Sequence, residues 1–151
     1  MTVSEIMKTD VATCTLEDDL ASVAKIMHER SCGFLPVIDS HGLVTGVITD
    51  RDVCTAAADG SRPMTRHGVK DAMSHPVFSC FPDENVKVTM ATMARRHVRR
   101  LTVLDRQGHL QGVLSIDDVI QAPGRRGAPT SEEIVAALKG IGAPKTVEVT
   151  A

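Results

Sequence analysis

The sequence contains no tryptophan and no tyrosine, and its only aromatic side chains are three phenylalanines. So few rings leave few platforms on which single-stranded bases can stack. The formal net charge is only −2, so no bulk attraction to nucleic acid or to an anionic membrane is expected. No apolar run approaches the roughly 18 residues of a transmembrane helix. The N-terminus also lacks the basic-then-apolar pattern of a signal peptide. We therefore expect a cytoplasmic protein with no membrane partner, for which nucleic acid is not the main ligand.

Cysteine is sparse, and no two of the four cysteines form a CxxC pair. A cytosolic compartment disfavours disulfides, so we expect all four to be small buried hydrophobic residues. They are Cys14, Cys32, Cys54 and Cys80. A metal or redox pair formed by Cys14 and Cys80 is the alternative. The histidines lack a metal-ligand spacing such as HxxxH, and no metal site is predicted.

What the sequence does contain is an internal repeat. Residues 3–54 and 69–120 align at a constant offset of 66 without a gap. One supersecondary unit was therefore copied, and the copies are predicted to pack face to face about a pseudo-two-fold axis, with the functional site in the cleft between them. The predicted organisation is a first repeat (1–58), a linker (59–68), a second repeat (69–121) and a further linker with a short C-terminal helix (122–151).

Each copy is predicted to fold as β-α-β-β-α, which places the protein in the α+β class. In copy one, apolar residues at helical spacing follow a short helical turn (4–7) and a strand (11–14), and Thr15-x-x-Asp18 is predicted to cap the helix. These apolar residues are Leu20, Val23, Ala24 and Met27. Strands 34–39 and 43–49 then form a hairpin, and a second helix begins at residue 50. The corresponding ranges in copy two are 70–73, 77–80, 83–97, 100–105 and 110–115, with the second helix from residue 116.

A further helix is predicted after the second repeat. Thr130-x-x-Glu133 has the spacing of a capping box, and Ile134, Val135 and Leu138 follow as an apolar face. That face can pack back onto the core or dock onto a partner. The sequence leaves both open.

The most specific local motif is Gly46-Val-Ile-Thr49-x-x-Asp52, which recurs as Gly112-Val-Leu-Ser115-x-x-Asp118. A hydroxyl followed three residues later by aspartate is the pattern of a helix-capping box, which is a purely structural role. The same geometry suits a ligand. A helix N-terminus and a hydroxyl can bind phosphate, and an aspartate can accept hydrogen bonds from the vicinal hydroxyls of a ribose. The two interpretations are compatible.

Taken together, the duplicated unit, Gly33-Phe-Leu-Pro36-Val37 and the Gly-h-h-[Thr/Ser]-x-x-Asp endings resemble a pair of CBS domains over residues 3–121. The resemblance implies two clefts for adenosine-containing effectors such as AMP, ADP or ATP, with NAD or S-adenosylmethionine as further options. It also implies a homodimer and no catalytic cofactor. By position, Thr49 and Asp52 would hold ribose and phosphate in one cleft, and Ser115 and Asp118 in the other.

The same resemblance assigns the adenine slots to the first strand and the first hairpin strand of each repeat. The residues implied are Val11, Thr13, Leu35, Pro36, Val77, Ser79, Leu101 and Val103. Copy two departs from the family pattern, because Arg99 and Thr102 stand where copy one has Gly33 and Pro36. The base selectivity of the second slot is therefore in question.

Residues 95–100 form a basic stripe, Arg-Arg-His-Val-Arg-Arg. Cations at a helix C-terminus are favourable by themselves, which accounts for Arg95 and Arg96. The resemblance assigns His97, Arg99 and Arg100 to a phosphate clamp. The corresponding positions of copy one carry Ser31, Gly33 and Phe34, so we expect one cleft to prefer a more highly phosphorylated ligand.

The function predicted from these features is nucleotide sensing without catalysis. We find no nucleophile–base constellation, Walker loop or metal set, and so we predict no enzymatic activity. The alternative is a structural adaptor or a nucleic-acid-binding protein that uses the basic stripe and the C-terminal helix. A nucleic-acid binder would show a steep salt dependence. Neither the regulated protein partner nor the effector can be named from the sequence.

Overall fold

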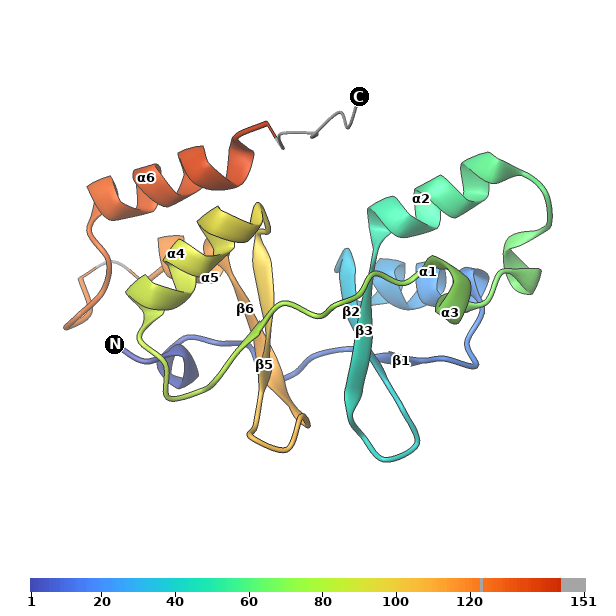
Figure 1. Cartoon of the computed structure of the whole chain (residues 1–151), viewed down its shortest axis with the longest axis horizontal. Coiled ribbons are helices and arrows are strands. Elements are labelled where there is room, and N and C mark those ends of the chain that lie inside the picture. The colour runs from blue at the N-terminus through green and yellow to red at the C-terminus, as the bar shows by residue number, and fades with distance from the viewer. Residues whose placement is uncertain (123, 145–151) are drawn as a thin grey trace, which may run out of the picture. The chain divides into compact units, whose positions relative to one another are not determined.

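The computed structural model describes residues 1–122 and 124–144, which contain two three-stranded sheets with helices packed on them (Figure 1). The described residues divide into two compact units. The β1–β3 unit comprises residues 10–77 and 105–110, and the β4–β6 unit comprises residues 1–9, 78–104 and the chain from residue 111. We describe each unit by itself.

In the β1–β3 unit, β2 (Phe34–Ile38) lies between β1 (Cys14–Thr15), which is parallel to it, and β3 (Val44–Thr49), which is antiparallel. The helices are α1 (Leu20–Glu29), α2 (Asp50–Asp59), α3 (Val69–Ala72) and the 3-10 turn η2 (Met64–Arg66). Apolar residues of α1 pack against alternate residues of the sheet. Leu20, Val23, Leu35, Val37 and Ile48 are fully buried in this core.

The β4–β6 unit repeats this plan with β4 (Ser79–Cys80), β5 (Arg100–Leu104) and β6 (Leu110–Ser115), in that order across the sheet. Its helices are α4 (Val86–Arg96), α5 (Ile116–Ile120), α6 (Ser131–Gly142) and the 3-10 turn η1 (Val3–Glu5). The core joins α4 to the sheet through Val86, Met90, Met93, Leu101 and Val103. These elements confirm the predicted α+β class.

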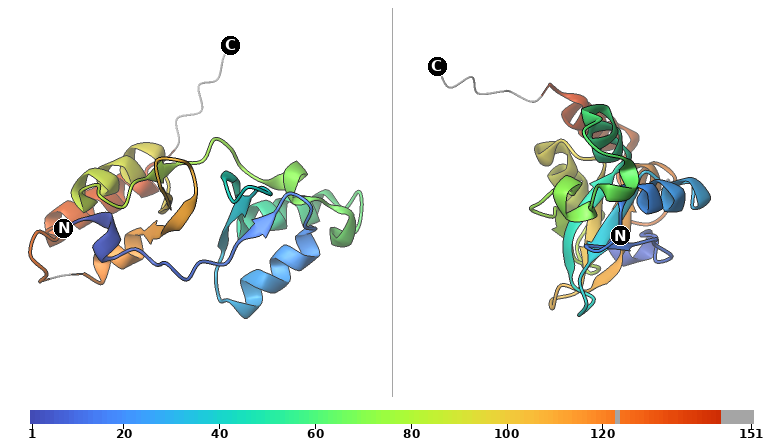
Figure 2. Two further views of the ribbon diagram at one scale, coloured as in Figure 1. Left: turned by 90° about the horizontal axis from the view of Figure 1, so that it is seen from below. Right: turned by 90° about the vertical axis from the view of Figure 1, so that its right-hand side faces the viewer.

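The short segment before the first strand of each repeat packs on the other repeat's sheet. Val3 is buried in the core of the β4–β6 unit, and Lys8 forms a backbone bridge with Val113 in β6. In the other unit, Val69 is buried in the core and Ser74 bridges to Val47 in β3. The N-terminal turn lies beside the start of α4, about 80 residues further along the sequence, because the N–H groups of Val3 and Ser4 donate to the carbonyl oxygens of Glu84 and Pro82 (Figure 2). The sequence repeats and the compact units are thus different divisions of the chain.

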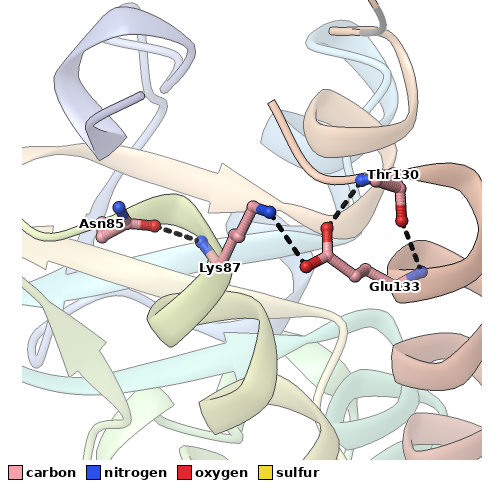
Figure 3. Close-up of polar contacts among 4 residues, drawn as sticks. All are labelled: Asn85, Lys87, Thr130 and Glu133. Carbon is pink, nitrogen blue, oxygen red and sulfur yellow. Dashed lines mark hydrogen bonds and ion pairs between the residues drawn. The ribbon is translucent and has the colours of Figure 1, made fainter. Parts of the chain in front are cut away.

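The C-terminal helix α6 packs back onto the core of the β4–β6 unit, along α4, which answers the question that the sequence left open (Figure 1). Ala137 is buried, and Ile134 and Leu138 pack against the same core. Thr130 and Glu133 form the predicted capping box. Glu133 also forms an ion pair with Lys87 of α4, with Nζ of Lys87 2.9 Å from Oε1 of Glu133 (Figure 3). Val135 was predicted on the apolar face, but it points outward and is 49% exposed.

Three local predictions need correction. The first strands are shorter than predicted and start later, at Cys14 and Ser79. Thr15 and Asp18 do form a hydrogen-bonded turn, but the cap of α1 is Asp19, whose side chain accepts the N–H of Ser22.

The third correction concerns the cysteines. Cys14 and Cys80 are buried as expected, Cys32 is half-buried, and Cys54 is exposed because it lies on the outer face of α2. Cys14 and Cys80 belong to different hydrophobic cores. Burial raises the pKa of each of these two thiols to about 12.

Among the described residues, no helix is both long enough and apolar enough to cross a membrane.

Candidate functional site

The repeated motif forms a capping box at the end of each third strand, as its spacing predicts. At the junction of β3 and α2, Oδ2 of Asp52 accepts the N–H and the hydroxyl of Thr49, each at 2.8 Å, and Oγ1 of Thr49 accepts the N–H of Asp52 at 3.2 Å. The extended backbone of Thr49 ends the strand and starts the helix. These bonds fix the Asp52 carboxylate and leave its second oxygen out of the cap.

The second copy of the motif has the same geometry. Oδ2 of Asp118 accepts the N–H of Ser115 at 2.8 Å and its hydroxyl at 2.5 Å, and Oγ of Ser115 accepts the N–H of Asp118 at 3.2 Å. The Asp118 side chain is only 8% exposed. A buried carboxylate with one oxygen engaged by the cap has a second oxygen that can accept further hydrogen bonds.

The segments that precede the first strands, residues 3–8 and 69–74, each pack on the sheet of the other repeat, and we call them the exchanged segments. The second carboxylate oxygen of each aspartate faces one of them. Oγ of Ser74 lies 3.4 Å from Oδ1 of Asp52, and Nζ of Lys8 lies 3.5 Å from Oδ1 of Asp118. Lys8 and Ser74 are equivalent positions, 66 residues apart. The sequence reasoning missed both, because the repeat alignment pairs these residues but does not say onto which sheet each segment packs.

The exchanged segments also pack against the glycine that begins each repeated motif, Gly46 or Gly112. A Cβ atom on Gly46 would lie 2.6 Å from Sδ of Met73, and one on Gly112 would lie 2.5 Å from the carbonyl oxygen of Lys8. Both glycines are buried in their strands. Glycine at these positions therefore lets residues 7–8 and 73–74 approach the strand that leads to each aspartate.

The residues predicted for the adenine slots fall into two groups. Leu35, Leu101 and Val103 have fully buried side chains in the hydrophobic cores, so only their backbone atoms remain for a ligand. The other predicted residues lie on or beside the strands: Val11, Thr13 and Val77 are half-buried, Pro36 is buried and Ser79 is exposed. Because strand side chains alternate, Pro36 lies on the opposite face of β2 from Leu35 and Val37.

The two slots differ in their backbone hydrogen bonding. The N–H of Thr102 donates to the carbonyl oxygen of Phe78 at 3.1 Å. The equivalent pair in the first repeat is Pro36 and Ala12, and proline has no N–H to donate. The Phe78 carbonyl is therefore engaged by β5, whereas Pro36 leaves the Ala12 carbonyl without this donor. Thr102 is also fully buried, and its hydroxyl has no hydrogen-bond partner among the described residues.

The basic stripe of residues 95–100 is spread over several local contacts in the β4–β6 unit. Arg96 stacks over the ring of Phe78 at 5.3 Å, and Arg99 pairs with Asp117 at 3.5 Å. His97 ends α4 in a left-handed conformation, with a buried Nδ1 that has no partner among the described residues. Arg100 is the first residue of β5. The Arg99–Asp117 pair is more than half exposed on the arginine side and contributes little to stability.

Gly33 and Arg99 have different local surroundings. A Cβ atom on Gly33 would lie 2.5 Å from Oδ2 of Asp50, at the start of α2. In the second repeat the position of Asp50 is taken by Ile116, which is buried in the core. A side chain at position 33 would require the Asp50 side chain to move, whereas the second repeat has no carboxylate at the equivalent position.

Among the described residues, no cluster of three or more His, Cys, Asp or Glu side chains could hold a metal ion.

A protein-family model described as CBS domain matches residues 3–59 and 69–125. An uncharacterized 17.7 kDa protein of Acidianus ambivalens is 34% identical over 122 residues, covering 80% of this chain and 71% of that protein. Some relatives with enzyme names are much larger. The chain is 27% identical over 117 residues to a homoserine O-acetyltransferase of Methanococcoides burtonii, of which it spans only 23%.

Solved structures have the same fold. The CBS domain pair of protein MJ0100, in complex with 5′-methylthioadenosine and S-adenosylmethionine, has a TM-score of 0.73 at 22% identity. CBSX2 in complex with AMP has a TM-score of 0.71 at 23% identity. Each match covers 80% of this chain and 94% of the other chain. At these identities the likeness shows the fold.

Proposed function

The chain belongs to the CBS-domain family, and from this premise we propose that it is a regulatory module that binds adenosine-containing ligands and has no catalytic activity of its own. AMP, ADP and ATP are the expected effectors, with NAD and S-adenosylmethionine as further candidates. Two structural relatives are described as complexes with such ligands, which supports this class of ligand. The family resemblance also predicts a homodimer.

The observation that carries the proposal is the position of the two aspartates. Each has one carboxylate oxygen fixed by a capping box and a second oxygen that points toward a single side chain of the exchanged segment. A carboxylate held in this way is preorganised to accept the two hydroxyls of a ribose, because its rotamer is already fixed by the helix cap. Thr49 and Ser115 are therefore positioning residues as well as candidate ligand contacts.

We further propose that the two sites differ in selectivity. In the β1–β3 unit, Pro36 leaves the Ala12 carbonyl without a donor from β2, so this carbonyl is available to accept a hydrogen bond from a base amino group. In the β4–β6 unit, Thr102 engages the equivalent carbonyl of Phe78. The β4–β6 unit carries the basic stripe instead. Tighter base recognition is thus expected near Asp52, and stronger phosphate recognition near Asp118.

Calorimetric titration of the full chain with AMP, ADP, ATP, NAD and S-adenosylmethionine, each in turn, tests the proposal. We expect saturable binding of at least one of them with a stoichiometry of one or two per chain. The absence of binding across this panel would contradict the proposal. Guanosine monophosphate is a suitable control, because it carries the same ribose and phosphate on a different base.

A further inference from the structure

Positions 8 and 74 are equivalent in the repeat, yet one carries a lysine and the other a serine. Both side chains contact the aspartate oxygen that the capping box leaves unused. Nζ of Lys8 lies 3.5 Å from Oδ1 of Asp118, and Oγ of Ser74 lies 3.4 Å from Oδ1 of Asp52. The two candidate sites are therefore built alike, except that one contains a cation opposite its carboxylate.

A contribution to stability does not explain why position 8 carries a lysine. The Lys8 side chain is 72% exposed, and an ion pair with one partner so exposed contributes little to stability. The backbone already fixes the segment, because the N–H groups of Lys8 and Val113 donate to each other's carbonyl oxygens at 3.0 and 2.9 Å. The ammonium group can therefore leave Asp118 without disturbing the segment that carries it.

We propose that Lys8 makes the site at Asp118 selective for phosphorylated ligands, whereas the site at Asp52, with Ser74, distinguishes ligand charge less. This inference rests on the proposed function. A ribose that binds Asp118 must take the oxygen that Lys8 contacts, so the ammonium group has to move away. A 5′-phosphate lies on the same ribose and can accept the displaced ammonium group as a charge-assisted partner.

A neutral nucleoside provides no such partner. It displaces the ammonium group from Asp118 and leaves it in water, so its binding includes the loss of the ion pair without compensation. Ser74 has no charge, and its hydroxyl can both donate and accept. The hydroxyl can therefore remain beside Asp52 when a ribose binds, whether or not the ligand carries a phosphate.

The test compares AMP with adenosine on full-length variants, with one site silenced at a time. Asp52→Asn removes the outer carboxylate oxygen at the first site, so the remaining binding reports on Asp118. In this background, Lys8→Ser should reduce the ratio of AMP affinity to adenosine affinity by about fivefold, the equivalent of one exposed charge pair. Raising the salt concentration should reduce the same ratio in the presence of Lys8 and have a smaller effect after Lys8→Ser.

The reciprocal change gives a matched control. In an Asp118→Asn background, Ser74→Lys should raise the AMP-to-adenosine ratio at the remaining site. Lys8→Gln keeps the length of the side chain without its charge and should behave as Lys8→Ser. Thermal melting followed by circular dichroism verifies that each variant is folded.

Two failures can be told apart. If AMP binds and Asp118→Asn weakens it, but Lys8→Ser and Lys8→Gln leave the ratio unchanged, the inference about Lys8 is wrong and the proposed function stands. If neither AMP, adenosine nor any other ligand of the panel binds the natural protein, the proposed function itself fails and the inference falls with it. If AMP and adenosine bind the Asp52→Asn, Asp118→Asn double variant as tightly as the natural protein, the two aspartates are not the ribose contacts, and the inference about Lys8 is wrong although nucleotide binding stands.

Discussion

Replacing Asp52 by asparagine or by alanine separates its structural role from its proposed ligand-binding role. Oδ2 accepts two hydrogen bonds from Thr49 at 2.8 Å, whereas Oδ1 faces Ser74 at 3.4 Å. Asparagine retains one oxygen, which can take the place of Oδ2 in the cap, and puts an NH₂ group at the outer position. Alanine removes both oxygens.

The expected effect on stability follows from the cap. Loss of a capping side chain costs about 1 kcal/mol, which corresponds to a decrease in melting temperature of about 2–4 °C for a chain of this size. We expect this decrease for Asp52→Ala. For Asp52→Asn we expect little change, because the asparagine oxygen can still accept the N–H and the hydroxyl of Thr49, and its NH₂ group can donate to Ser74.

The expected effect on binding follows from the outer oxygen. A hydrogen bond to a charged group contributes on the order of 1.5–3 kcal/mol, so its loss reduces affinity about tenfold or more. Both variants lose the outer acceptor. Asp52→Asn and Asp52→Ala should therefore weaken AMP binding at this site by similar factors although their stabilities differ, and the affinity of the Asp118 site should remain unchanged.

Calorimetric titration with AMP and thermal melting by circular dichroism measure the two effects. If Asp52→Asn binds AMP as tightly as the natural protein, the outer oxygen does not accept the ribose hydroxyls and the argument is refuted. If only Asp52→Ala weakens binding, the loss comes from fraying of α2 and the role of Asp52 is purely structural. The same pair of substitutions at Asp118 should give the same pattern at the other site.

Four further predictions concern stability and reactivity. Gly112→Ala should destabilise the protein by about 1–3 kcal/mol in denaturant titrations, because the new Cβ would lie 2.5 Å from a backbone oxygen, whereas Gly46→Ala should cost less because it meets only a flexible methionine side chain. Gly140→Ala should loosen α6 and speed its proteolysis, because the new Cβ would lie 2.9 Å from Cβ of Ala94 in α4, whereas Gly142→Ala, with nothing within 4 Å, should not. The two buried thiols, with pKa values raised to about 12, should react with Ellman's reagent at pH 8 only on unfolding, unlike exposed Cys54. Because these thiols have a pKa near 9 in the unfolded chain, the free energy of unfolding measured by denaturant titration should fall as the pH rises above about 9.

Features that depend on residues three or four apart could be predicted from the amino-acid sequence alone. Thr49 and Asp52, Ser115 and Asp118, and Thr130 and Glu133 form capping boxes because the first turn of a helix brings side chains at this spacing onto each other's N–H groups. The hairpins follow from Gly42 and Gly108, which adopt the positive φ angles that their turns need. The exact gapless repeat then predicted two similar sheets and, by resemblance, the CBS fold.

The sheet that each exchanged segment covers could not be predicted from the sequence, because it is set by long-range packing in the folded chain. Both repeats present nearly the same apolar surface, so local patterns around Val3 and Val69 are compatible with either sheet. The choice depends on long-range packing, and it places Lys8 beside Asp118 and Ser74 beside Asp52. The packing of α6 against α4 also depends on the tertiary structure. The apolar pattern of an amphipathic helix shows which face is buried, but it does not identify the surface against which that face packs.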